Sequence, residues 1–595
     1  MATESNRVVR RGPYPEFTWP GLLVGWILGI LITVSMSYAS LILGFSIEGS
    51  ELAAILGWGL LRGAMRRTSI VENNINQTLA SAVNGASAGM MFSIPALFIL
   101  SDRLQKPEVT QFDPVAMVLV CITGGIVGLA FVIPLRKQMI DLERLPYPGG
   151  IAVAAILKTP GEGIRKSLWL GLAAVFSGGT YFVVTQCFGE HPQWHAGAQL
   201  GLPAFLNVTF FLSVMTIGVG YLSGVGGFWF GAGGFLCYWV LAPLLTWVGD
   251  ESVRQMVSEN APQTPDTLRG ALFRPVGIGM LIGAALGGVV SAFPLIRSAL
   301  QALHEARRSS RVSSAENGSM VSEEMPVWWL YTAILGGGAL LGCVLYWSVP
   351  GMSWPLAALM TLLGLLWTWI ASVIIAECVG RTNWSPLSGM TLIGVTLLIL
   401  VARTRLEQAT TIIASVMLGA AICVAIAQAS DMMLDLKSGY LIGAVPRRQQ
   451  IAQVLGTWLG PLIVIVLIFL LHQRYQLGSE KLPAPQAQAL ATMIEGILVK
   501  GDVPIPRYLA GAGLGAVLAL SGLGGIGVLV GLGFYMPFST VLTYSIGCIM
   551  RIASDRVLGR KWAEETGIPL AAGLIVGEAL VGVGLALWHV VLGGH

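Results

Sequence analysis

The sequence predicts an all-α integral membrane protein with about 16 transmembrane helices, and its composition gives the first evidence. Of its 595 residues, 54% are hydrophobic and 11% are charged, whereas soluble domains carry about 25% charged residues. Mostly apolar runs recur along the chain, and many approach the roughly 20 residues that a helix needs to cross the hydrocarbon core. The 75 glycines fit this class, because small residues let membrane helices pack closely.

The apolar runs fall into two groups of eight on either side of a polar segment. The first group lies near residues 18–43, 50–66, 79–100, 113–135, 167–187, 203–222, 226–247 and 275–300. The second lies near 327–347, 354–378, 387–402, 409–429, 451–471, 505–521, 523–552 and 566–591. We therefore expect a first transmembrane repeat at 1–302, a polar cytoplasmic linker at 303–325 and a second transmembrane repeat at 326–595.

The two halves look like diverged copies of one unit. Trp19 precedes Asn73 by 54 residues, and Trp329 precedes Asn383 by 54 residues. Each asparagine belongs to a polar cluster that opens the third expected span of its half. Matching polar interruptions in two repeats are typical of transporters that hold a substrate between the repeats.

Basic residues in short loops predict which side of the membrane is cytoplasmic. By parity, one side receives Arg7, Arg10, Arg11, Arg62, Arg66, Arg67, Arg136, Lys137, Arg307, Arg308, Arg311, Arg447 and Arg448. This predicts a multi-pass protein of the cell membrane with a cytoplasmic N-terminus. One basic cluster, Arg551 to Lys561, falls on the wrong side unless the run at 523–552 breaks at Met536–Pro537 and crosses twice. The small net charge of +4 suggests no nucleic-acid partner.

A polar cluster from Glu72 to Thr78 begins an otherwise apolar run. One interpretation is a helix start at the membrane interface, where polar side chains cap free backbone N–H groups. The other is substrate binding by Glu72, Asn73, Asn74 and Gln77, because amide side chains both donate and accept hydrogen bonds. The run that follows is rich in Ala, Gly, Ser and Met, which suits a helix that faces protein or a cavity.

Isolated carboxyl groups in apolar runs are candidates for proton coupling. Charged residues are expensive inside a membrane and usually face a cavity or a partner, and a carboxyl group removed from water takes up a proton more readily. Glu72, Glu377 and Glu578 are therefore the predicted proton-coupling residues. The alternative for Glu377 and Glu578 is a structural pair near a helix end.

Tyr147 lies between two prolines, and the run after it, Gly149 to Leu157, is too short to span a membrane. We expect a re-entrant or broken helix here, with Tyr147 near the substrate; a surface turn is the alternative. Asp431, Asp435, Lys437 and Tyr440 are either the counterpart of this element in the second half, with Tyr440 near the substrate, or part of a water-exposed cytoplasmic loop. Asn383 is the corresponding substrate-binding candidate of the second half.

Several motifs together resemble the oligopeptide transporter family, which includes the yellow stripe-like metal-chelate transporters. They are ENNINQT at 72–78, LPYPGG at 145–150, NWSPLSG at 383–389, DLKSGYLIGA at 435–444, YMPFS at 535–539 and GLIVGEAL at 573–580. The resemblance implies proton-coupled secondary transport of peptides or metal chelates by a duplicated bundle of about 16 helices. The short N-terminus is more similar to that of prokaryotic members, which implies a bacterial inner membrane.

The leading hypothesis is a proton-coupled importer of short oligopeptides, with the substrate, protons and the lipid bilayer as partners. Many such bundles associate in pairs, so a homodimer is one alternative. The nearest rival is uptake of metal–chelate complexes, in which the protein would grip the carboxylates of a siderophore or an amino-acid-derived chelator. A passive channel, or a membrane-embedded enzyme that acts on lipid-linked substrates through Asp431 and Asp435, is a further alternative. The duplication argues against the enzyme. The seven cysteines fit helix packing, and neither a cofactor nor a protein-held metal is expected.

Overall fold

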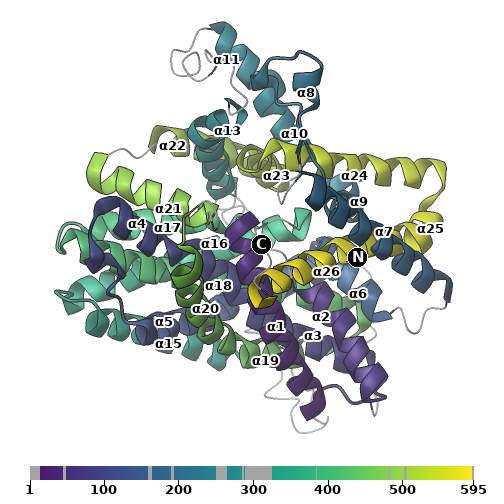
Figure 1. Ribbon diagram of the computed structural model, residues 1–595, viewed down its shortest axis with the longest axis horizontal. Helices are drawn as coiled ribbons and strands as arrows, with labels where there is room; N and C mark the ends of the chain where they lie inside the picture. The colour runs from purple at the N-terminus through teal and green to yellow at the C-terminus, as the bar shows by residue number, and fades with distance from the viewer. Residues whose placement is uncertain are drawn as a thin grey trace, which may run out of the picture.

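The computed structural model describes residues 14–43, 49–158, 164–188, 193–248, 264–284, 324–383, 385–479, 484–500 and 505–592, and the single residues 257, 287 and 482. Most of these residues are helical (Figure 1). Two strands of two residues each, β1 (Gln193–Trp194) and β2 (Phe210–Phe211), pair antiparallel. The predicted fold class, all-α, is confirmed.

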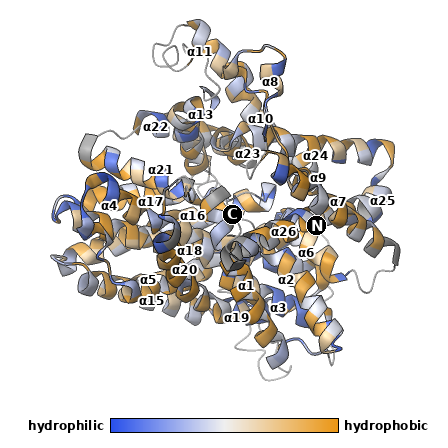
Figure 2. Cartoon of the chain, in the orientation of Figure 1, coloured by the Kyte–Doolittle hydropathy of each residue, from blue (hydrophilic) through white to orange (hydrophobic). Residues whose placement is uncertain are grey.

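Ten helical stretches in the described part of the chain are long and apolar enough to cross a membrane. Their elements are α1 (Trp19–Leu43), α3 (Ile70–Ser93) with α4 (Pro95–Leu104), α5 (Pro114–Val132), α7 (Ile164–Phe188), α10 (Phe228–Phe235) with η7 (Leu236–Leu241) and α11 (Ala242–Val248), α15 (Val327–Ser348), α16 (Trp354–Thr382), α18 (Gln408–Ile442), α19 (Pro446–Thr457) with α20 (Leu459–Tyr475), and α25 (Arg560–Trp562) with η11 (Ala563–Gly567) and α26 (Ile568–Leu592). Hydrophobic residues dominate most of these helices (Figure 2). The chain is a multi-pass membrane protein, although the expected number of 16 spans is not confirmed.

Shorter or more polar helices complete the bundle. They are α2 (Ser50–Gly57) with η1 (Trp58–Ala64), η2 (Pro107–Thr110), η3 (Lys137–Leu142), α6 (Pro148–Lys158), α8 (Ala196–Gln199), η5 (Ala204–Leu206), α9 (Val214–Ser223), η6 (Gly224–Gly227), α13 (Thr264–Leu268), η8 (Arg269–Phe273), α17 (Leu387–Ala402), α21 (Pro485–Glu495), η9 (Gly496–Lys500), α22 (Ile505–Leu518), η10 (Ala519–Leu523), α23 (Gly524–Tyr535) and α24 (Phe538–Val557). The 11 residues of α6 confirm the short helix expected after Tyr147.

Three of the expected spans differ from the structure in where a helix begins or breaks, and the runs at 50–66, 387–402 and 505–521 form helical stretches too short to be among the ten. The run at 203–222 holds η5, β2 and only the ten-residue α9, because Pro203 and a left-handed Asn207 (φ 48°) interrupt it. The run at 523–552 breaks before Pro537, which separates α23 from α24, as the alternative interpretation allowed. The helix expected at 79–100 already begins at Ile70, so it contains the polar cluster. Most of 275–300 and of the linker at 303–325 lies outside the described residues.

Helices α3 and α18 form the centre of the bundle. Every residue of α3 from Val71 to Ser93 is buried, and α18 is buried along nearly its whole length. Helix α5 packs closely on α18 through glycine: a Cβ atom at Gly124 or Gly128 would lie 2.4 or 2.1 Å from the carbonyl oxygen of Ala421 or Ala425. In Figure 1, α1, α3 and α19 lie in the lower half of the view, whereas α10, α22 and α23 lie in the upper half.

Polar contacts join four of the predicted cytoplasmic segments at one end of the bundle. Arg448, at the start of α19, pairs with Glu16, just before α1. Arg136 lies 2.5 Å from Glu324, before α15, and Glu324 also accepts a hydrogen bond from Gln450 at 2.5 Å. These segments share one end of the molecule, as the parity of the basic loops predicts. Their cytoplasmic location remains a prediction.

Candidate functional site

The beginning of α3 and the end of α18 form a buried polar interface. The two helices are antiparallel: Asn74 contacts Ser438, and Gln77 contacts Asp435. Helix α2 covers one side of this interface and α19 another. We define the polar core as Ser50 and Glu51 of α2, Asn73, Asn74, Asn76, Gln77, Thr78 and Ser81 of α3, Asp431, Asp435 and Ser438 of α18, and Gln449 of α19. All of these side chains are buried except that of Asp431, which is partly exposed.

Asp435 accepts hydrogen bonds from polar-core residues of three neighbouring helices, α2, α3 and α19. Its Oδ1 atom accepts a hydrogen bond from Gln77 Nε2 at 2.5 Å and lies 3.2 Å from Ser50 Oγ. The Ser50 hydroxyl is also 3.0 Å from Ser81 Oγ. The backbone carbonyl of Asp435 accepts from Gln449 Nε2 at 2.8 Å. No group in the described part of the chain donates to Asp435 Oδ2, although this atom is buried.

The asparagines of α3 are held by neighbouring polar groups but keep unused acceptors. Asn74 Nδ2 donates to Ser438 Oγ at 3.1 Å and to Gln77 Oε1 at 3.2 Å. Asn73 Nδ2 donates to the Ala54 carbonyl at 2.9 Å, and Asn76 Nδ2 donates to Asn73 Oδ1 at 3.0 Å. The Oδ1 atoms of Asn74 and Asn76 are buried without a donor among the described residues. A buried acceptor without a donor costs about 1–3 kcal/mol, so these atoms are suited to receive N–H groups from a ligand.

The polar core is closed in this conformation. A Cβ atom at Gly57 would lie 2.2 Å from both Asn73 Oδ1 and Asn76 Nδ2, and one at Gly439 would lie 1.8 Å from Gln449 Oε1. Even a methyl group would therefore clash at these positions. A substrate can reach the polar groups only if the surrounding helices move apart.

Glu72 lies at a capped helix start, and its side chain is buried. Ser69 is the N-cap of α3, and its hydroxyl accepts a hydrogen bond from the backbone N–H of Glu72 at 3.3 Å, as in a helix start. The Glu72 side chain is nevertheless buried, where it pairs with Arg67 and accepts a hydrogen bond from Thr18. The helix thus starts at the partly exposed Ser69 and is buried from Val71 onward.

Tyr147 and Asn383 meet where α6 contacts α16. The Tyr147 N–H donates to the Gly380 carbonyl at 2.8 Å, and the hydroxyl donates to the Ala376 carbonyl at 3.1 Å. Asn383 Oδ1 accepts from the Gly149 N–H, near the start of α6, at 2.7 Å. Both residues have left-handed backbones, with φ of 46° for Tyr147 and 63° for Asn383. Asparagine adopts this conformation readily, whereas it is uncommon for a bulky residue such as tyrosine. Since Tyr147 is fully buried, the alternative of a surface turn is wrong.

The other two predicted coupling residues have local partners. Glu377 pairs with Arg381 one turn later on α16, and Arg381 also lies 3.9 Å from Glu143. Glu578 accepts from Ser213 Oγ at 2.7 Å and from the Met215 N–H at 2.8 Å, so it holds the N-terminus of α9. These contacts match the structural alternative for each residue and leave their coupling role untested.

The predicted water-exposed loop at Asp431 to Tyr440 is wrong, because α18 continues as a helix to Ile442. Asp435 is fully buried, and the buried Lys437 Nζ donates to the Leu145 carbonyl at 2.7 Å. Lys437 Nζ also lies 5.8 Å from the ring centre of Tyr440. Glu51 was not among the predicted site residues. The available signal was its position as an isolated acid in the mostly apolar run from residue 50 to 61.

The match to known proteins spans almost all of the chain. The family model described as "OPT oligopeptide transporter protein" matches residues 16–589. The chain belongs to the oligopeptide transporter family. It is 28% identical to a Haemophilus influenzae protein that carries an oligopeptide transporter name, over 92% of each chain. It is 24% identical to YSL11 of Oryza sativa, which carries a metal-nicotianamine transporter name, over 83% of this chain and 74% of that one. YSL8 of Arabidopsis thaliana, named in the same way, is also 24% identical, over 80% and 69%.

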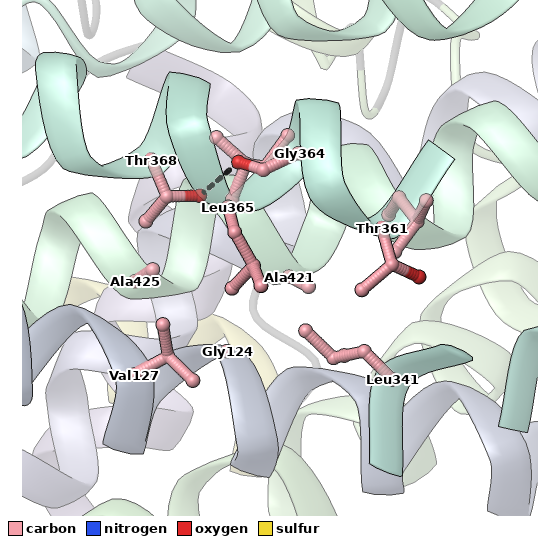
Figure 3. Close-up of a pocket in the computed structure, with 11 residues that line it drawn as sticks. Gly124, Val127, Leu341, Thr361, Gly364, Leu365, Thr368, Ala421 and Ala425 are labelled. Atoms are coloured by element: carbon pink, nitrogen blue, oxygen red, sulfur yellow. Dashed lines mark hydrogen bonds between the residues drawn. The ribbon is translucent and has the colours of Figure 1, made fainter. Parts of the chain in front are cut away.

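The transporter also has an apolar cavity outside the polar core (Figure 3). It has a volume of about 10 Å³ and lies between α5, α15, α16 and α18, with Leu341 and Val127 on one side and Leu365 and Ala421 on the other. Its lining is apolar except for two threonines. The Thr368 hydroxyl donates a hydrogen bond to the Gly364 carbonyl at 2.7 Å. Such a lining does not suit a hydrophilic substrate, so the cavity is a poorer candidate site than the polar core.

Proposed function

We propose that the chain is a proton-coupled secondary active transporter that imports short oligopeptides, and that the polar core is its substrate site. Family membership places the chain among membrane transporters, which favours transport over catalysis on lipid-linked substrates. The observation that carries the substrate site is the set of buried acceptors without donors, Asn74 Oδ1, Asn76 Oδ1 and Asp435 Oδ2.

The chemistry of the polar core is complementary to a peptide. A peptide presents backbone N–H and C=O groups and a terminal ammonium group. The amides of Asn73, Asn74 and Gln77 can pair with both kinds of backbone group, and Asp435 can accept from an ammonium group. Tyr147 and Asn383 then act by holding α6 against the polar core, since Gly150 of α6 packs on the backbone of α18. Tyr440 lies beside Lys437 in the same region, with its ring near the Lys437 ammonium group.

Uptake of metal–chelate complexes is the second candidate. It is favoured by the plant relatives that carry metal-nicotianamine transporter names and align with most of this chain. A chelate held by an amino-acid-derived ligand presents carboxylate and amine groups, which can bind the same amides. The metal would be held by its chelator, and the protein would recognise the complex as a whole.

Uptake into proteoliposomes separates these substrates. The purified protein is reconstituted, a proton gradient is imposed, and accumulation of di- to hexapeptides is compared with that of iron and nickel chelates. We expect peptides to accumulate only when the gradient is present. Failure of both substrate classes to accumulate above empty vesicles would contradict the proposal.

A variant of the polar core tests the site itself. We expect Asn74→Leu to lower peptide uptake by about tenfold, because one lost hydrogen bond to a buried amide contributes about 1–1.5 kcal/mol. The matched control is Thr361→Val, which removes a buried hydroxyl that also lacks a partner among the described residues but lies in the apolar cavity. Equal uptake by the two variants would exclude the polar core as the substrate site.

A further inference from the structure

We infer that Glu51, Asp431 and Asp435 together carry the coupling proton. The inference rests on the proposed proton-coupled transport and assigns the coupling to residues other than Glu72, Glu377 and Glu578. The first evidence is position. Asp431 and Asp435 are four residues apart on α18, so they lie on the same face of the helix. That face is turned toward α3 and α2.

The three carboxyl groups converge from two helices. Asp431 Oδ2 lies 2.8 Å from where a Cβ atom at Gly85 of α3 would be. Asp435 reaches Gln77 of α3 and Ser50 of α2. Glu51 follows Ser50 directly and interacts electrostatically with both aspartates. The absence of a side chain at Gly85 leaves the room that the Asp431 carboxylate occupies.

No ion pair in the described part of the chain includes any of these three residues. The nearby cations are engaged elsewhere: Lys437 donates to the Leu145 carbonyl, Arg67 pairs with Glu72, and Arg448 pairs with Glu16. From α3 and α19 the groups that face Asp435 are uncharged, namely Gln77, Ser81 and Gln449.

Glu51 and Asp435 are buried, and Asp431 is partly exposed. The three carboxylates cannot all be ionised at a low energetic cost, because like charges repel and a buried charge without an ion-pair partner is strongly unfavourable. The Oδ2 atom of Asp435 is a buried oxygen that lacks a donor in the described part of the chain, and a proton on this carboxyl group removes the charge. When the helices move apart and water enters, the proton can leave as the O–H bond breaks. Protonation therefore favours the closed arrangement, and a ligand that binds one conformation better shifts the equilibrium toward it.

The other buried acids lack this combination of features. Glu72 and Glu377 each have an arginine within ion-pair distance. Glu578 accepts two hydrogen bonds at the N-terminus of α9, where the helix dipole stabilises an anion. An arginine or a helix N-terminus thus compensates the charge of each of these carboxylates. Glu72 Oε2 is, like Asp435 Oδ2, a buried atom without a donor among the described residues, but Arg67 pairs with its carboxylate.

Two transport assays on the same proteoliposomes test the inference. Gradient-driven uptake requires net proton movement, whereas exchange of labelled for unlabelled peptide at equal pH does not. These three residues also belong to the polar core, so we expect Asp435→Asn, Asp431→Asn and Glu51→Gln each to lower exchange without abolishing it. We expect the imposed proton gradient to add nothing to the uptake that remains. The matched control is Glu407→Gln, an exposed acid at the start of α18, which should retain both activities.

The outcomes separate this inference from the proposed function. Parallel loss of uptake and exchange in the three variants would show a structural or binding role and overturn the inference, as would unchanged gradient-driven uptake. Wild-type protein that shows no gradient-driven uptake would instead contradict the proposed function. If Asp435→Asn elutes as aggregate in size-exclusion chromatography, Asp431→Asn decides the matter, because the Asp431 side chain is partly exposed and its replacement disturbs packing less.

Discussion

At the residue scale, the partners of a buried acid indicate whether it stabilises a helix end or is suited to carry a proton. Glu578 satisfies the Ser213 hydroxyl and the Met215 N–H at the N-terminus of α9. Asp435 has a carboxylate oxygen that no described residue satisfies. Both are acids in largely apolar helices, and the sequence around each does not separate the two roles, since Glu578 and not Asp435 was among the predicted coupling residues. Only their contacts separate them, and these contacts come from residues that are hundreds of positions away.

Glu578 is therefore expected to contribute mainly to stability. Replacement by alanine leaves a buried hydroxyl and a buried N–H without an acceptor, which costs about 1–3 kcal/mol for each group. We expect Glu578→Ala to lower the midpoint of thermal unfolding in detergent, and Glu578→Gln to lower it less, because the amide oxygen can still accept. Identical midpoints for wild type and Glu578→Ala would contradict this role.

At the element scale, close helix contacts depend on glycine. Helix α5 approaches α18 so closely that a Cβ atom at Gly128 would lie 2.1 Å from the Ala425 carbonyl oxygen. This contact supports the part of α18 that leads to the polar core. The same helix explains why the expected water-exposed loop was wrong. The charges from Asp431 to Lys437 suggested water, yet α18 buries Asp435 against Gln77 of α3 and Lys437 against the Leu145 carbonyl. The helical spacing of Gln428, Asp431 and Asp435 was the available signal.

A pair of glycine variants tests this packing. We expect Gly128→Ala to destabilise the protein by about 1–3 kcal/mol, because the two backbones must separate to admit the methyl group. Gly336→Ala on α15 is the control: nothing lies within 4 Å of its Cβ position, and an alanine in a helix interior is about 0.5–1 kcal/mol more favourable than glycine. Thermal unfolding should thus shift in opposite directions. A similar shift for both variants would exclude the contact as a source of stability.

At the scale of the whole molecule, the two halves of the sequence interlock. The polar core joins α3 of the first half to α18 and α19 of the second, and Asn383 of the second half caps the start of α6 of the first. The sequence predicted the fold class and the short α6, and the substrate role of the cluster at Glu72 to Gln77 stays a prediction. It could not predict the pairing of Asp435 with Gln77, since that pairing depends on how distant helices pack. The sequence also overestimated the regularity of the spans at 203–222 and 523–552, where proline interrupts the helices.

The central claim is that the buried polar core opens to water during transport, and thiol labelling tests it most directly. The exposed native cysteines, Cys187 and Cys343, are replaced by alanine, and Ser438→Cys places a thiol in the polar core. The buried Cys423 on the same helix is the internal control.

We expect a small water-soluble thiol reagent to label Ser438→Cys in proteoliposomes, and transported peptide to protect it. Cys423 should remain unlabelled in both conditions, because it packs among apolar side chains. If Ser438→Cys reacts no faster than Cys423, with or without peptide and a proton gradient, the polar core does not open to water and cannot be the path of the substrate.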